Sequence, residues 1–102
     1  MSNPISISSG EKNNNSIIAT RPVALTAVSV HTDGANNCTV SVYDSATAAN
    51  NGKKIGKWLV PGASQYGGRN IVTPTYAANG LYVEVTGGGT YFIEYLTKDI
   101  VG

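Results

Sequence analysis

Apolar and polar residues alternate in short stretches along the chain, and the clearest stretch has Leu81, Val83 and Val85 at every second position. A period of two is typical of a half-buried strand, because successive side chains of a strand point to opposite faces. The glycines that follow, Gly87–Gly89, can adopt positive φ and reverse the chain. We therefore predict that this strand and Thr90–Leu96 are antiparallel neighbours in one sheet, with the three aliphatic residues facing the core.

The same alternation predicts further strands at Pro4–Ser8, Ile17–Thr20, Val23–Thr32, Cys38–Tyr43, Lys53–Val60 and Ile71–Ala77. Along Val23–Thr32, the apolar residues change from one face of the strand to the other. This indicates a bulge near Thr26 or Ala27, unless both faces of the strand are covered. Pro74 favours an edge position or a bulge for the last one. Asp33–Asn37 is a strong turn signal, so residues 31–44 form a second candidate hairpin.

Short strands separated by turn signals predict an all-β protein of about seven to eight antiparallel strands. At 102 residues the chain is one domain. We predict a single β-sandwich, jelly-roll-like or immunoglobulin-like, over residues 17–102, preceded by an N-terminal arm and polar loop at 1–16. Cys38 and Trp58 are expected in the core of this sandwich, and Pro61–Asn70 is expected to be a Gly-rich loop.

Composition excludes several classes of function. Charged residues make up 13% of the chain and the formal net charge is +1. A dedicated nucleic-acid binder usually shows a strong basic patch, so this balance argues against one. The single cysteine allows no internal disulfide and fits a protein made in a reducing cytosol. We find no signal peptide at the N-terminus and no apolar run long enough to span a membrane.

Candidate catalytic and metal-binding residues are few. Glu84 and Glu94 would be neighbours in the predicted hairpin, but an open sheet face is not the cleft that paired catalytic carboxylates need. His31 is the single histidine, and beside a turn we expect it to form a hydrogen bond rather than act as a base. Asp33 and its neighbours are the residue types of a β-turn, and the spacing of a calcium loop is absent. We therefore predict no catalytic residue, no metal site, no cofactor and no enzyme activity.

Three pieces of the sequence carry a family resemblance. Val40–Asp44 is followed by a small-residue loop, and Gly80–Gly88 runs into an aromatic strand at Tyr91–Tyr95. With these pieces, the chain from Val23 to Leu96 resembles the small all-β accessory proteins of tailed-bacteriophage virions, including capsid cement and decoration proteins. It also resembles β-sandwich modules of phage tail and fibre proteins. The resemblance implies binding to coat subunits, a trimeric or other symmetric arrangement, and a place in the virion after synthesis in the host cytoplasm.

We therefore expect a capsid cement or decoration protein, a non-enzymatic structural protein that binds and stabilises an assembled shell. Its partners would be the major capsid protein or another coat protein and further copies of itself, without nucleic acid or membrane. The expected partner-binding residues are Ile5 and Ile7, because their arm can add to an exposed sheet edge. Gln65, Tyr66 and Arg69 complete the set, because an aromatic residue on an exposed loop suits a partner anchor.

The alternative function is that of a phage tail or fibre module that binds host-surface carbohydrate. Such a module should show a row of aromatic side chains on one exposed face, or a cleft built from loops. A cement protein should instead show extended termini and loops that reach neighbouring subunits. A small enzyme or an inhibitor is the third alternative, and the absence of catalytic clusters in the sequence argues against the enzyme.

Overall fold

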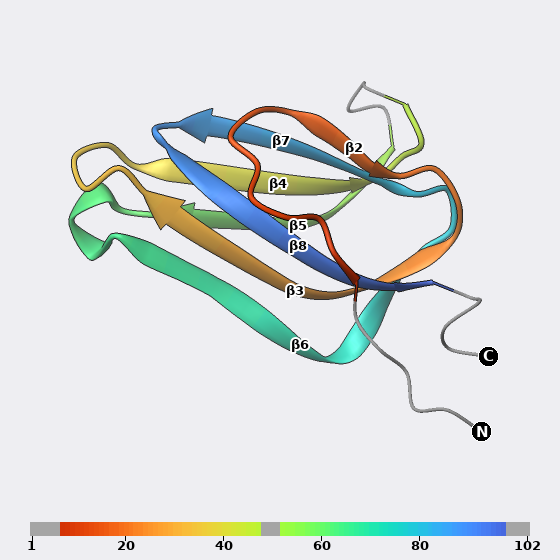
Figure 1. The fold of residues 1–102 in the computed structure, drawn as a ribbon. Coiled ribbons are helices and arrows are strands. Elements are labelled where there is room, and N and C mark those ends of the chain that lie inside the picture. Colours follow the sequence, from red (N-terminus) through yellow and green to blue (C-terminus); the bar gives the residue numbers. More distant parts are fainter. Residues whose placement is uncertain (1–6, 48–51, 98–102) are drawn as a thin grey trace.

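The protein is a β-sandwich of two four-stranded antiparallel sheets (Figure 1). The structure is a computed structural model that describes residues 7–47 and 52–97, except for the side chains of residues 69–74. The strands are β1 (Ile7–Ser8), β2 (Ser16–Ala19), β3 (Val23–Thr32), β4 (Cys38–Asp44), β5 (Lys53–Val60), β6 (Tyr66–Ala77), β7 (Leu81–Gly87) and β8 (Gly89–Thr97). A short 3-10 helix, η1 (Gly62–Ser64), precedes β6, and no described helix is long and apolar enough to cross a membrane.

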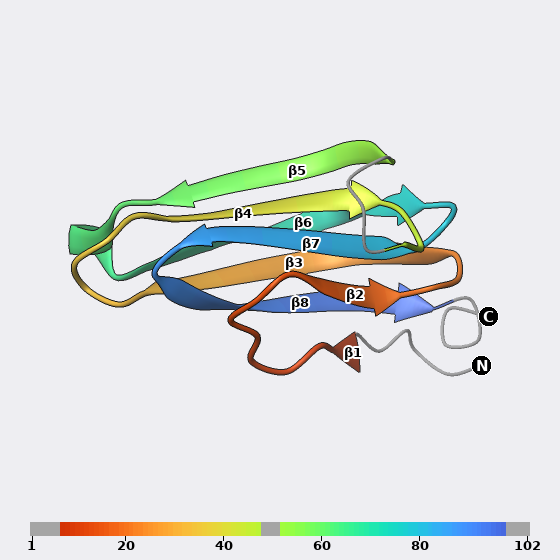
Figure 2. The same cartoon turned by 90° about the horizontal axis from the view of Figure 1, so that it is seen from above.

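The strand order is that of a jelly roll. One sheet has the order β1-β8-β3-β6 and the other the order β2-β7-β4-β5, and Figure 2 looks down on the second sheet, which lies over the first. Each strand of the first half therefore pairs with its counterpart in the second half: β1 with β8, β2 with β7, β3 with β6 and β4 with β5. This nested pairing is how an eight-stranded jelly roll closes around one core. The predicted all-β sandwich is confirmed.

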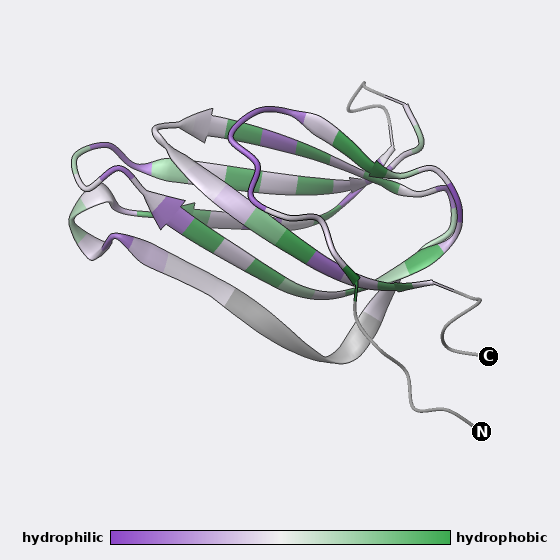
Figure 3. Ribbon diagram, viewed as in Figure 1, coloured by the Kyte–Doolittle hydropathy of each residue, from purple (hydrophilic) through white to green (hydrophobic). Residues whose placement is uncertain are grey.

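The core lies between the two sheets and is filled by the alternating apolar residues. Figure 3 shows green residues alternating with paler or purple ones along β3, β4 and β7. The largest fully buried side chains are Tyr91, Leu25, Leu81, Ile93, Val30, Val40, Val42, Val83 and Cys38. Burial of each large aliphatic side chain contributes about 1.5–3 kcal/mol. The prediction that Leu81 and Val83 face the core is confirmed, and so is the burial of Cys38, whereas Val85 is only partly buried.

The predicted hairpin of Leu81–Thr86 and Thr90–Leu96 is wrong. Both strands form, but β7 lies in one sheet and β8 in the other, so Gly87–Gly89 carries the chain across the sandwich. The second predicted hairpin, residues 31–44, is wrong for the same reason, because β3 and β4 also lie in different sheets. Among the described strands, only β4 and β5 are both consecutive in the chain and paired.

Two irregularities predicted from the sequence occur in the sheet of β3. A register shift separates Leu25 from Ala27 against both neighbours of β3, which confirms a bulge at this point. On β6 the partners of these two residues are Thr75 and Asn70, so the strand is irregular around Pro74 and lies at the edge of its sheet. An edge strand tolerates proline because the missing N–H faces away from the ladder.

The connection between β5 and β6 is shorter than the predicted Pro61–Asn70 loop, because β6 already begins at Tyr66. Trp58 is also less buried than predicted. It lies on β5, an edge strand with β4 as its single neighbour in the sheet, and it is only partly buried. The ring folds back over Gly56, where an added Cβ would overlap it, and packs against the rim of the core.

The segment before β2 lies along β8 in its own chain. Ser9 N–H donates to Ile93 O over 2.8 Å, and the backbones of Lys12 and Tyr91 exchange two hydrogen bonds of 2.9 and 2.8 Å. The Tyr91 hydroxyl donates to Asn14 O over 2.7 Å. Part of the predicted N-terminal arm therefore covers the edge of β8, while residues 1–6 lie outside the described residues.

Candidate functional site

The sequence-predicted binding residues lie at two opposite ends of the sandwich. Ile7 is in β1, which pairs with β8 at the end of the sandwich where β3 begins (Figure 2). Gln65 and Tyr66 lie beside the end of β3, because Tyr66 pairs with His31. β3 has ten residues, so its ends are about 30 Å apart. The backbone of Arg69 lies in β6 and pairs with Val28 of β3, but its side chain is not among those that the structure describes. Ile5 lies outside the described residues altogether.

The first recess, which we call the Tyr66 notch, is about 400 Å³ in volume. Its lining residues are His31, Thr32, Asp33, Gly34, Gln65 and Tyr66. They come from the end of β3, the turn that follows, and the junction of η1 with β6. The structure therefore brings the predicted residues Gln65 and Tyr66 together with His31 and Asp33, which the sequence placed only in a turn.

Hydrogen bonds to Thr32 fix the floor of the Tyr66 notch. Its backbone N–H donates to Gln65 O over 2.7 Å, and its hydroxyl donates to Gly62 O over 3.0 Å. The same hydroxyl accepts from Gly34 N–H over 3.2 Å. Thr32 thus joins the turn after β3 to the junction of η1 with β6. The geometry of the notch is therefore set before any ligand binds.

An aromatic row extends from the Tyr66 notch across the outer face of one sheet. Tyr66 on β6 pairs with His31 on β3, and the His31 ring makes an edge-to-face contact with Phe92 on β8, with centroids 5.9 Å apart. The exposed fraction of Tyr66 is 72%, so its ring is available to a ligand. His31 Nε2 lies 3.1 Å from the Ser29 hydroxyl. Sequence reasoning missed this row. A signal was present, because Ser29 and His31 alternate with the apolar Val28 and Val30 and therefore point to the outer face of the sheet.

Asp33 shapes the loop at the rim of the Tyr66 notch. Its Oδ1 accepts from the backbone N–H groups of Ala35 and Asn36 over 2.9 and 2.8 Å, and its Oδ2 accepts from Asn36 Nδ2 over 3.0 Å. These bonds, led by the one from the Asn36 backbone, lower the pKa of Asp33 from 3.8 to about 2. The turn predicted from these residue types is confirmed, and its carboxylate stays ionised throughout the neutral range.

Asp33→Asn should destabilise the fold at neutral pH and have no effect at strongly acidic pH. The folded pKa lies below the unfolded one, so the stabilisation is present above about pH 3.8 and disappears as pH falls through about 2. The measurement is the urea midpoint of the parent and the variant at neutral pH and near pH 2. An equal difference between the two proteins at both pH values would contradict this assignment.

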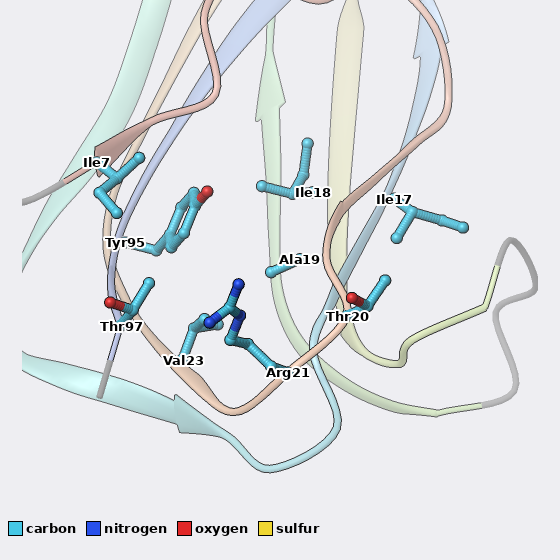
Figure 4. Close-up of a pocket in the computed structure, with 9 residues that line it drawn as sticks. All are labelled: Ile7, Ile17, Ile18, Ala19, Thr20, Arg21, Val23, Tyr95 and Thr97. Carbon is cyan, nitrogen blue, oxygen red and sulfur yellow. The ribbon is translucent and has the colours of Figure 1, made fainter. Parts of the chain in front are cut away.

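The second recess, which we call the Ile7 cleft, lies at the opposite end and is also about 400 Å³ in volume. Its lining residues are Ile7, Ile17, Ile18, Ala19, Thr20, Arg21, Val23, Tyr95 and Thr97. Figure 4 shows Arg21 extending into a space between side chains of β1, β2, β3 and β8, among them Ile7, Ile18 and Tyr95. Ile17 is 43% exposed although it is a large aliphatic residue. The alternation of Ile5 and Ile7 pointed to this end, but only the pairing of β1 with β8 brings Tyr95 to it.

The carboxylates that the sequence offered for acid–base chemistry are separated. Glu84 lies on β7, on the side opposite to Val83, and accepts a 3.4 Å hydrogen bond from the Tyr43 hydroxyl. Glu94 is exposed on β8, in the other sheet. The two therefore lie on the two outer faces of the sandwich. Within residues 7–47 and 52–97, no three His, Cys, Asp or Glu side chains are grouped to hold a metal ion.

The two recesses are thus the features from which a function can be argued. The Ile7 cleft has a mixed lining of aliphatic side chains with Arg21 and hydroxyl-bearing residues, and the Tyr66 notch is polar and aromatic with one carboxylate. Comparison with known proteins gives no independent assignment of either recess. The chain matches no protein-family model, no curated protein and no solved structure.

Proposed function

We propose that this chain is a capsid cement or decoration protein that binds an assembled viral shell through the Ile7 cleft. The proposal rests partly on the sequence resemblance to phage accessory proteins and on the jelly-roll fold, which virion proteins often use. A fold serves many functions, so this part of the support is analogy. The observation that carries the proposal is the open cleft, whose lining includes several aliphatic side chains, with the exposed Ile17 among them.

The chemistry of the cleft favours one kind of occupant. Apolar side chains around an open recess are buried when a partner inserts an apolar side chain of its own. A segment of coat protein that presents an apolar side chain therefore fits the cleft best.

A cement protein acts by linkage. A protein that binds the assembled shell and not the separate subunits shifts the equilibrium toward the shell, by an amount set by its concentration relative to its Kd. Many copies on one particle add their contributions. The proposed place of action is therefore the virion, and the proposed partner is the coat protein, with further copies of the chain arranged by the symmetry of the shell.

The test compares the thermal midpoint of purified shells with and without the protein. We expect the parent protein to raise this midpoint, and Ile17→Asp to weaken shell binding at least tenfold, because a carboxylate would be buried beside apolar side chains. Leu59→Asp is the matched control, since Leu59 is 60% exposed on β5 and does not line the Ile7 cleft. Equal midpoints with and without the parent protein would refute the cement role.

A further inference from the structure

We propose that the Tyr66 notch is a binding site for one residue of a neutral saccharide. This inference goes beyond shell binding and does not depend on it, because the notch and the Ile7 cleft lie at opposite ends of β3. A sugar ring has an apolar face of C–H groups and a rim of hydroxyls. A site for it needs an exposed aromatic ring with polar groups at its edge, held by a rigid scaffold.

The backbone of Gln65 gives the first argument. Gln65 has a φ of 69° and a ψ of −35°, and among described residues other than glycine it is alone in having positive φ. Glycine would adopt this conformation without a Cβ penalty, so glutamine is strained there. Its backbone is already used, since its N–H donates to Gly62 O and its carbonyl accepts from Thr32. Gln65 is exposed, so burial does not explain why a residue with a side chain occupies this strained position. A role of its side-chain amide in binding a ligand would explain it.

The polar groups of the notch give the second argument. Within the described part of the chain, neither the Gln65 amide nor the Tyr66 hydroxyl makes a side-chain hydrogen bond, although both residues line the notch. The amide offers two donors and an acceptor, and the hydroxyl offers one donor. Sugar hydroxyls both donate and accept, so these two side chains match the rim of a sugar bound on the Tyr66 ring.

The surroundings of Tyr66 keep its ring uncovered. Gly68 is the next residue of β6 on the same face, and it lies opposite Ser29, so β6 places no side chain next to Tyr66 in that direction along the strand. Gly68 has a φ of 137°, and a Cβ there would overlap Val28 O, so a larger residue is excluded. The backbone conformation at Gly68 therefore keeps the surface beside Tyr66 free of a side chain. His31 and Phe92 continue the aromatic surface onto β3 and β8.

Charge selects a neutral sugar over an acidic one. Among the side chains that the structure describes, those that line the notch include the carboxylate of Asp33 and no lysine or arginine. A sialic acid, a uronic acid or a phosphorylated sugar would bring a second negative charge to this place and would be repelled. A neutral hexose or N-acetylhexosamine would not.

The experiment titrates the 102-residue chain with maltotriose, N,N′,N″-triacetylchitotriose, a neutral galactose-containing trisaccharide and 3′-sialyllactose, and follows backbone amide resonances. We expect one or more neutral sugars to shift Gly34, Gln65 and Tyr66 in a saturable way, and sialyllactose to have no effect. Tyr66→Ala should weaken the binding at least tenfold. Tyr76→Ala is the matched control, because Tyr76 is an exposed tyrosine on the same strand but outside the notch, and it should bind as the parent does.

Gln65→Gly separates ligand binding from folding. This variant should unfold at the same or a higher urea concentration than the parent, because the strain is relieved, yet bind the sugar about five- to tenfold more weakly, because one hydrogen bond is lost. Unchanged binding in this variant would overturn the role of the amide. No response to any neutral sugar at millimolar concentration would overturn the site. Loss of shell binding by Tyr66→Ala without any sugar response would assign the notch to a protein partner instead.

Discussion

Tyr91→Ala should lower the free energy of unfolding by about 3–5 kcal/mol, as expected for a fully buried aromatic side chain. The exposed fraction of Tyr91 is 0%, and its ring lies in the core between the two sheets. Its hydroxyl also donates to Asn14 O, so the substitution removes both core volume and the bond that holds the segment before β2. Urea unfolding of parent and variant, followed by intrinsic fluorescence, measures the loss.

Tyr91→Phe is the matched variant, because it keeps the ring and removes only the hydroxyl. It should cost about 0.5–1.5 kcal/mol, the net value of one hydrogen bond, since Asn14 is exposed and water can replace the lost donor. Burial raises the pKa of Tyr91 above its ordinary value of 10.0. Stability from the neutral hydroxyl is therefore complete below pH 10 and is lost as pH rises above it. The parent should lose stability in this range more steeply than Tyr91→Phe.

Similar losses for the alanine and phenylalanine variants at neutral pH would show that the ring contributes little packing.

Gly87→Ala should destabilise the protein by about 3–5 kcal/mol, because it combines backbone strain with a steric overlap. Gly87 has a φ of 91°, and a Cβ at this residue would overlap the carbonyl oxygen of Asn37. That oxygen belongs to the loop between β3 and β4, which is anchored to the core through Cys38. The overlap therefore cannot be relieved by rotating a side chain.

Gly34→Ala provides the matched control for this prediction. Gly34 has a nearly identical φ of 89°, but an added Cβ there would meet nothing within 4 Å. This variant should cost only the strain of a left-handed residue, about 1–2 kcal/mol. Thermal or urea unfolding of the two variants separates strain from overlap. Equal losses would mean that the turn after β7 relaxes and that close approach to Asn37 does not matter.

The period of two was enough to locate most strands. The bounds of β3 and β5 agree with the predicted Val23–Thr32 and Lys53–Val60, and the bulge near Thr26 was visible as a change of parity. Pairing was not predictable in the same way. A glycine turn permits both a hairpin and a crossing to the opposite sheet, because both need positive φ. The nearness of Gly87 to Asn37, which decides between them, depends on residues fifty positions apart.

The candidate sites were predictable only in part, for a related reason. Tyr66 and Gln65 could be selected from local sequence, because an aromatic residue among glycines after a proline suggests exposure. His31 and Phe92 join Tyr66 only through the register of three strands, and no local pattern encodes that register. Trp58 shows the converse error: its size predicted burial, but its place on an edge strand decided its exposure.

The nested pairing of strands has a consequence for how the chain reaches this fold. The β4–β5 pair joins neighbours in sequence, whereas β3–β6, β2–β7 and β1–β8 each enclose a progressively longer stretch of chain. Closing a longer loop costs more conformational entropy before its contacts form, and such topologies fold in milliseconds to seconds. We therefore expect the order of assembly to run outward from β4–β5, with the segment along β8 docking last. The Ile7 cleft involves the outermost pair, β1–β8, so it would be completed only in the late steps of folding, whereas the Tyr66 notch lies on the β3–β6 pair and would form earlier.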